Sequence, residues 1–120
     1  ISEGSAQNVL LLSYWDYVDE ATLAKVYPNG FPGWDIEHGG VLETALMMRL
    51  YPSFVNEAAM VDHPAADLPR FDRLPVVPER TPATGCLSSP QGASREKGEW
   101  LFSAAASAIA SDLLHELNLT

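Results

Sequence analysis

The sequence predicts part of an α/β protein in which a parallel sheet is flanked by helices, and three observations support this. A short, continuous apolar run near the start, NVLLLSY at residues 8–14, is typical of a strand buried on both faces. Three later segments have helical spacing, and a long proline-rich stretch has no period at all. One parallel strand cannot form a sheet. We therefore expect the other strands to come from another polypeptide or from an N-terminal portion that these residues do not include.

Two helices are expected in the first half of the chain. Residues 19–27 begin with two acidic residues, as a first helical turn prefers, and Pro28 with the Asn29-Gly30 turn ends that segment. A second helix begins after Gly40, where the sequence VLETALMMRLY has one apolar face, and Pro52 ends it.

The second half of the chain combines an irregular segment with a long helix. Residues 63–93 hold six of the nine prolines and only a candidate strand at residues 74–77. Such a segment needs a surface to lie against, and we expect it to cross a neighbouring subunit. Ser94 is suited to cap a final helix with an apolar stripe that includes Leu101 and Ala105. Trp100 in this helix is expected to pack in the core.

Composition and charge exclude several classes of protein. Hydrophobic residues make up 47% of the chain and charged residues 19%, as in an ordinary globular protein. A formal charge of -9 argues against nucleic-acid binding, which requires clustered Lys and Arg. No apolar run approaches the roughly 20 residues of a membrane span, and the first residues do not resemble a signal peptide. Together with the single cysteine, Cys86, this predicts a cytoplasmic protein without a membrane partner. The chain starts at Ile1, so it is either processed or a piece of a longer chain.

Polar residues that could carry chemistry are concentrated in WDIEHGG at residues 34–40, followed by Glu43-Thr44. Asp35 and His38 are three positions apart, which allows a carboxylate and an imidazole to converge on one small ligand. The glycines permit close approach of a ligand, and the amides at the start of the following helix can stabilise developing negative charge.

The same pattern also fits a purely structural role, in which His38 only satisfies backbone groups at a helix start. Glu43 lies five residues after His38, so the two would face apart on a regular helix. Trp15 follows the predicted strand and Trp34 shares the loop of His38, which favours a ligand-binding role for both. The remaining histidines, His63 and His115, have no partners at metal-ligand spacing.

Five blocks of the sequence, in order, resemble the creatininase family of amidohydrolases. They are LSYWDYV, YPNGFPGWDIEHGGVLETALM, DHPAADLPRFD, PERTPATG and ASREKGE, and the similarity runs from about Asn8 to the end. WDIEHGG followed by ET resembles the creatininase branch more than the wider family, in which HAG is common. The resemblance identifies residues 1–120 as the C-terminal portion of a single creatininase-like domain.

The resemblance implies a hexameric enzyme that interconverts creatinine and creatine at a two-metal centre of zinc or manganese. The family's metal ligands lie in E-x-H, Asp and H-x-E segments of the N-terminal half, so no metal ligand is expected in this chain and a complementary half must supply them. The metal pair would deliver hydroxide to the lactam carbonyl while an imidazole donates a proton to the departing nitrogen.

The resemblance also implies roles for individual residues. His38 matches the histidine that transfers the proton, and Glu37 is expected to be catalytic beside it. The expected substrate-binding residues are Trp15, which closes over the pocket, together with Trp34, Asp35 and Gly39. The role of Glu43 is less defined. Ala45 replaces a frequent serine of the family, at a position that need not touch the ligand.

Two other functions fit the same residues. One is a related amide hydrolase of the family, such as a deformylase. The other is a non-catalytic interaction module that has lost its metal-binding half. The joint presence of Asp35 and His38 favours the enzyme, because binding alone does not require both.

Overall fold

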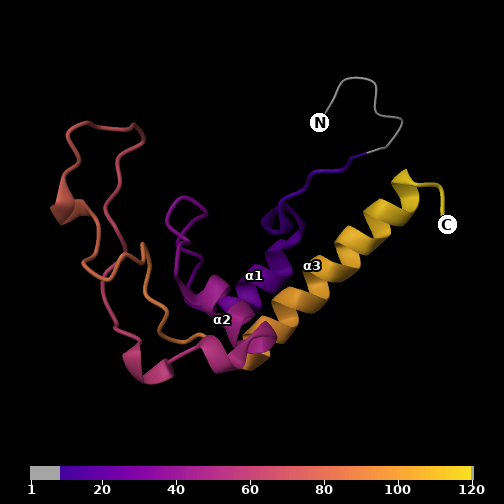
Figure 1. The fold of residues 1–120 in the computed structure, drawn as a ribbon, viewed down its shortest axis with the longest axis horizontal. Helices are drawn as coiled ribbons and strands as arrows, with labels where there is room; N and C mark the ends of the chain where they lie inside the picture. Colours follow the sequence, from indigo (N-terminus) through magenta and orange to yellow (C-terminus); the bar gives the residue numbers. More distant parts are fainter. Residues whose placement is uncertain (1–8, 120) are drawn as a thin grey trace.

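The computed structural model describes residues 9–119, in which three α-helices are joined by irregular segments and short 3-10 helices (Figure 1). The α-helices are α1 (Glu20–Val26), α2 (Val41–Leu50) and α3 (Arg95–Glu116). The 3-10 helices are η1 (Tyr14–Tyr17), η2 (Pro52–Phe54), η3 (Glu57–Ala59) and η4 (Pro78–Arg80). No helix of the described residues is both long enough and apolar enough to cross a membrane.

The three predicted helices are confirmed, and local side chains explain where they begin. The Asp19 carboxylate caps α1 by accepting a hydrogen bond from the Thr22 amide at 2.6 Å. The Ser94 hydroxyl caps α3 in the same way, by accepting from the Lys97 amide at 3.2 Å. After α1, Gly30 turns the chain with a φ of 106°, in the left-handed region that glycine adopts readily.

The core lies where α1 and η1 meet the crossing of α2 and α3. Its buried side chains are Val18, Val26, Val41, Leu42, Ala45, Leu101 and Ala105. At the crossing, Gly98 of α3 lies so close to the Ala45 carbonyl of α2 that a Cβ would collide with it. The ion pair of Arg49 with Glu99 joins the same two helices. Trp100 is half-buried against this core, as predicted.

The two predicted strands do not form in the described part of the chain. Residue 8 lies outside it, and residues 9–13 are irregular, with Leu11 98% exposed. Residues 74–77 also have no strand structure and lead into η4. A strand is held by hydrogen bonds to a neighbouring strand, and between residues 9 and 119 no segment supplies one. A parallel sheet therefore does not form from these residues alone.

The proline-rich segment is attached to its own chain at both ends. The Ala66 amide donates to the Leu87 carbonyl at 2.7 Å, and the Leu87 amide donates to the His38 carbonyl at 2.8 Å. Between these contacts, residues 67–83 project away from the helices (Figure 1). The ends of this segment therefore pack on their own chain beside the predicted site, and the contact of the segment with a neighbouring subunit stays a prediction.

Candidate functional site

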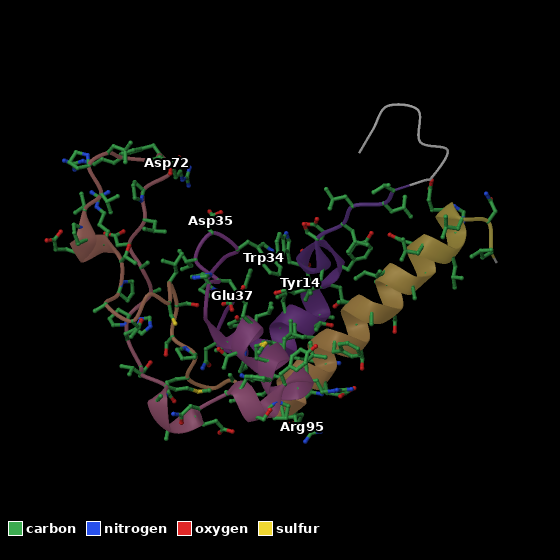
Figure 2. All side chains as sticks on the ribbon, in the orientation of Figure 1. Tyr14, Trp34, Asp35, Glu37, Asp72 and Arg95 are labelled. Atoms are coloured by element: carbon green, nitrogen blue, oxygen red, sulfur yellow. The ribbon has the colours of Figure 1, made fainter. Side chains whose placement is uncertain are left out.

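All the predicted site residues except Trp15, which lies in η1, are on the loop between α1 and α2, and Glu37 holds this loop in place. Figure 2 shows Asp35 at the outer end of the loop and Glu37 close to the start of α2. Glu37 is only 9% exposed. Its Oε2 accepts hydrogen bonds from the Tyr27 hydroxyl at 2.6 Å and the Ser88 hydroxyl at 3.3 Å. Its Oε1 accepts from the amides of Leu42 at 2.9 Å and Glu43 at 3.4 Å.

These contacts change the expected chemistry of the helix start. The amides of Leu42 and Glu43 were expected to face developing negative charge on a ligand. Instead they bind the chain's own carboxylate, which stabilises the positive end of the α2 dipole. The start of α2 is therefore a structural anchor, and charge stabilisation in a reaction has to come from other groups.

The Tyr27 hydroxyl makes the shortest hydrogen bond to the Glu37 carboxylate. It also accepts a hydrogen bond from the Leu42 amide at 3.0 Å. Burial, followed by the hydrogen bond to Glu37, raises the pKa of Tyr27 well above its ordinary value. The phenol therefore remains a hydrogen-bond donor throughout the neutral range.

His38 lies on the solvent side of the same turn and faces Glu43. Its side chain is 68% exposed, and its Nδ1 lies 3.8 Å from Glu43 Oε2. The same Oε2 accepts a hydrogen bond from the Gly39 amide at 2.6 Å. The expectation that His38 and Glu43 face apart was wrong, because His38 precedes the helix and the turn at Gly39, with a φ of 66°, brings its ring back over Glu43.

The structure does not bring Asp35 to His38 as the spacing suggested. Asp35 is exposed and borders a cavity of about 810 Å³ between the loop and residues 66–72. The geometry thus joins His38 with Glu43 and leaves Asp35 available to a ligand from another direction.

Gly39 and Gly40 allow the loop of Cys86 and Ser88 to pack on the start of α2. A Cβ at Gly39 would lie 2.6 Å from the Cys86 sulfur, and one at Gly40 would overlap the Ser88 hydroxyl and the Glu37 carboxylate. The described contacts of Gly39 are therefore packing contacts, and they account for a glycine at this position without a ligand.

Trp15 and Trp34, the two tryptophans expected to bind a ligand, lie at the surface and outside the core. Trp15 is 48% exposed and Trp34 is 43% exposed. Trp34 meets the Phe31 ring edge-on at a centroid distance of 4.8 Å, and Phe31 lies 5.0 Å from the Tyr27 ring. Trp15 meets Tyr14 edge-on at 5.4 Å. Each indole therefore has one aromatic support and a face open to a ligand.

Sequence reasoning missed three residues of this site, Tyr14, Tyr27 and Ser88. Tyr14 adjoins Trp15, and its pKa is raised by burial and then by the carboxylates of Glu43 and Glu37. Tyr14 and Glu43 line a largely apolar cavity of about 520 Å³ between α2 and α3. The position of Tyr14 next to Trp15 was a usable signal, whereas Ser88 is 51 residues from Glu37 and no local pattern points to it.

No group of three or more His, Cys, Asp or Glu side chains that could hold a metal ion occurs among residues 9–119. His63 contacts the Pro64 carbonyl and the Thr84 hydroxyl, and neither is a partner that would make a metal site. The described side chains therefore do not fit a metal centre by themselves.

The described residues are similar to part of several solved creatininase structures. A creatininase variant complexed with creatine matches with a TM-score of 0.85 and 53% identity, over 91% of this chain and 43% of that chain. A Zn-Zn form of a creatininase variant matches with a TM-score of 0.86 over the same shares of the two chains, and a manganese creatininase with 0.85.

Comparison with protein families and curated proteins gives the same result. The creatininase family model, described as creatinine amidohydrolase, matches residues 7–113. Creatinine amidohydrolase from Pseudomonas putida is 53% identical over 109 residues, which are 90% of this chain and 42% of that protein. This chain belongs to the creatininase family. It spans less than half the length of these relatives and corresponds to their C-terminal part.

Proposed function

We propose that this chain is the substrate-binding and proton-transferring portion of an amidohydrolase that interconverts creatinine and creatine. The observation that carries the proposal is the His38–Glu43 pair on the loop of the exposed Trp34, in a chain 53% identical to a creatinine amidohydrolase. Residues 1–120 would then be the C-terminal portion of a single domain, completed by an N-terminal half that provides the parallel sheet.

His38 is the proton donor in this proposal. Because Nδ1 faces Glu43, the imidazole presents Nε2 outward. Nε2 can there give a proton to the lactam nitrogen of creatinine as the bond from that nitrogen to the carbonyl carbon breaks. Glu43 orients the imidazole. The high exposure of His38 suits a group that must reach a bound ligand.

The substrate is held by exposed aromatic and acidic groups of η1 and of the loop that bears His38. Creatinine is flat and partly cationic, so the indole faces of Trp15 and Trp34 and the Asp35 carboxylate suit it. Gly39 contributes through its left-handed turn, which brings His38 beside Glu43. Both oxygens of the buried Glu37 carboxylate already accept hydrogen bonds from groups of this chain, so we assign it a positioning role in place of direct participation in the reaction.

We further propose that the metal ions, zinc or manganese, are bound by side chains of the N-terminal half. The relatives include Zn-Zn and manganese creatininases, and the described side chains of this chain form no metal cluster. The assembled enzyme would be a cytoplasmic homo-oligomer, a hexamer, as the family resemblance implies.

The proposal is tested with a chimera in which the part of the Pseudomonas putida relative that precedes the matched region is fused to this chain. We expect the purified chimera to hydrolyse creatinine in the presence of zinc or manganese and to lose this activity on chelation. This chain alone should be inactive and should bind neither metal. A folded, metal-loaded chimera that does not act on creatinine would refute the proposal.

Two outcomes of the same experiment identify the competing functions. Hydrolysis of a formylated aminopyrimidine in place of creatinine would indicate a deformylase of the same family. A chimera that carries its metals and acts on neither substrate would indicate a non-catalytic module. Metal content and circular dichroism of each preparation establish that the protein tested is folded.

A further inference from the structure

We propose that Tyr27 is a positioning residue that sets the substrate wall and the proton-transfer pair relative to each other. Its ring supports Trp34 through Phe31, and its hydroxyl supports Glu43 and His38 through Glu37. The inference rests on the proposed function and deepens it. It assigns an effect on substrate binding to the ring of Tyr27 and an effect on turnover to its hydroxyl.

The ring end of Tyr27 begins a series of aromatic contacts. Tyr27 and Phe31 have ring centroids 5.0 Å apart, and Phe31 and Trp34 are 4.8 Å apart in an edge-on contact. Tyr27 and Phe31 are half-buried, whereas Trp34 is largely exposed. Because the indole has one face open, Phe31 and Tyr27 determine the angle at which that face meets a ligand.

The hydroxyl end of Tyr27 is shared between the loop and α2. It donates to Glu37 Oε2 and accepts from the Leu42 amide, while Glu37 Oε1 accepts from the amides of Leu42 and Glu43. Removing the hydroxyl would leave Glu37 Oε2 with only the longer hydrogen bond from Ser88, and the Leu42 amide with only one of its two acceptors. The first turn of α2 could then shift, and Glu43 would move with it relative to Gly39 and His38.

The two ends can be tested separately in the chimera. Tyr27→Phe keeps the ring and removes only the hydroxyl, so we expect kcat to fall by on the order of tenfold with KM nearly unchanged, because one buried hydrogen bond is lost. Phe31→Leu removes the support of Trp34 and keeps the hydroxyl, so we expect KM to rise several-fold with kcat nearly unchanged. Tyr51→Phe, at an exposed tyrosine after α2, is the control for loss of a hydroxyl elsewhere and should alter neither constant.

A double-mutant cycle separates positioning from simple stabilisation. If Tyr27 acts through Glu43, the kcat effect of Tyr27→Phe should disappear in a Glu43→Gln background. Additive effects, or a Tyr27→Phe variant that changes only the thermal midpoint, would overturn the inference.

A crystal structure of the Tyr27→Phe chimera gives a readout that does not depend on activity. We expect the Glu43 carboxylate to move away from the Gly39 amide and from His38 Nδ1, and an unchanged loop would overturn the inference. Failure of the proposed function would give a different result. The parent chimera would then not hydrolyse creatinine, while the distances from Glu43 to the Gly39 amide and to His38 Nδ1 would still change in the Tyr27→Phe variant.

Discussion

Glu37 and His38 are neighbours in sequence with opposite environments, and this difference decides what each can do. The Glu37 carboxylate is buried and accepts hydrogen bonds from two side chains and two amides. The imidazole of His38 is mostly exposed and has a single carboxylate beside it. A group such as Glu37, whose hydrogen-bonding positions are filled by its own chain, stabilises the fold. An exposed group such as His38 can exchange a proton with a ligand.

For His38 we predict a loss of turnover without a loss of metal. Replacing His38 with Ala in the chimera should lower kcat by about 10²- to 10⁴-fold, the range of general acid-base groups, with KM changing less. Metal content should stay at the parental level, because the described residues of this chain form no metal cluster. His115→Ala, on the exposed end of α3, is the matched control.

Steady-state kinetics and metal analysis of both variants check this prediction. A His38→Ala chimera with parental kcat, or one depleted of metal, would return His38 to a structural role.

For Trp34 we predict an effect on binding. Trp34→Ala removes a stacking face that acts equally on the ground state and the transition state, so KM should rise and kcat should change little. Because Trp34 is largely exposed, the thermal midpoint of the chimera should also change little. A variant with unaltered KM, measured by creatinine titration, would remove Trp34 from the substrate pocket.

At the scale of elements, the crossing of α2 and α3 depends on the absence of a side chain at Gly98. Alanine has a higher helix propensity than glycine by about 1 kcal/mol, which alone would make Gly98→Ala stabilising. A Cβ at this position would overlap the Ala45 carbonyl and would lie 2.9 Å from the Arg49 Cβ, so the helices would have to separate. Overpacking typically costs about 1–3 kcal/mol, and we expect this cost to exceed the gain in propensity.

The predicted result for Gly98→Ala is a chimera with a lower free energy of unfolding. Ser107→Ala, at an exposed position of the same helix, controls for the change in helix propensity and should be neutral or slightly stabilising. Urea denaturation of the three proteins measures the difference. An unchanged or raised midpoint for Gly98→Ala would show that the crossing adjusts at no cost.

At the scale of the whole molecule, the described chain buries few large apolar side chains in its small core and exposes many. Large apolar side chains that are mostly exposed occur at Val9, Leu11, Phe54, Phe71, Leu74 and Val76. Exposed apolar surface of this extent favours association or aggregation. In the proposed enzyme, the N-terminal half and neighbouring subunits cover it.

We therefore predict that residues 1–120 alone lack a cooperative thermal transition as a monomer. The chain alone should bind a hydrophobic dye strongly, and the chimera should bind much less, because its added half covers residues 9–13. Calorimetry, dye fluorescence and light scattering of the two proteins test this. A monomeric chain with a sharp transition and little dye binding would contradict the prediction.

Local residue patterns were sufficient to predict the three helices, the cap at Ser94 and the loop before Gly40. Asp19 was expected in the first turn of its helix, and the structure makes it the N-cap. These features depend on contacts between residues within about four positions of one another, so the local sequence is enough to predict them. Trp15, from its place after a predicted strand, and Trp34, from the loop it shares with His38, were expected to bind a ligand. Both are exposed, although the strand before Trp15 does not form in the described residues. The family itself was recognised from ordered blocks such as WDIEHGG.

Only the tertiary structure decided what the loop residues contact. Ser88 reaches Glu37 across 51 residues, and Leu87 pairs with the His38 carbonyl, so no local period reveals either contact. The partnership of His38 with Glu43, in place of Asp35, follows from the left-handed turn at Gly39. For the same physical reason residues 9–13 are not a strand here: an apolar run sets a preference, but a strand exists only when a neighbouring segment accepts and donates its hydrogen bonds.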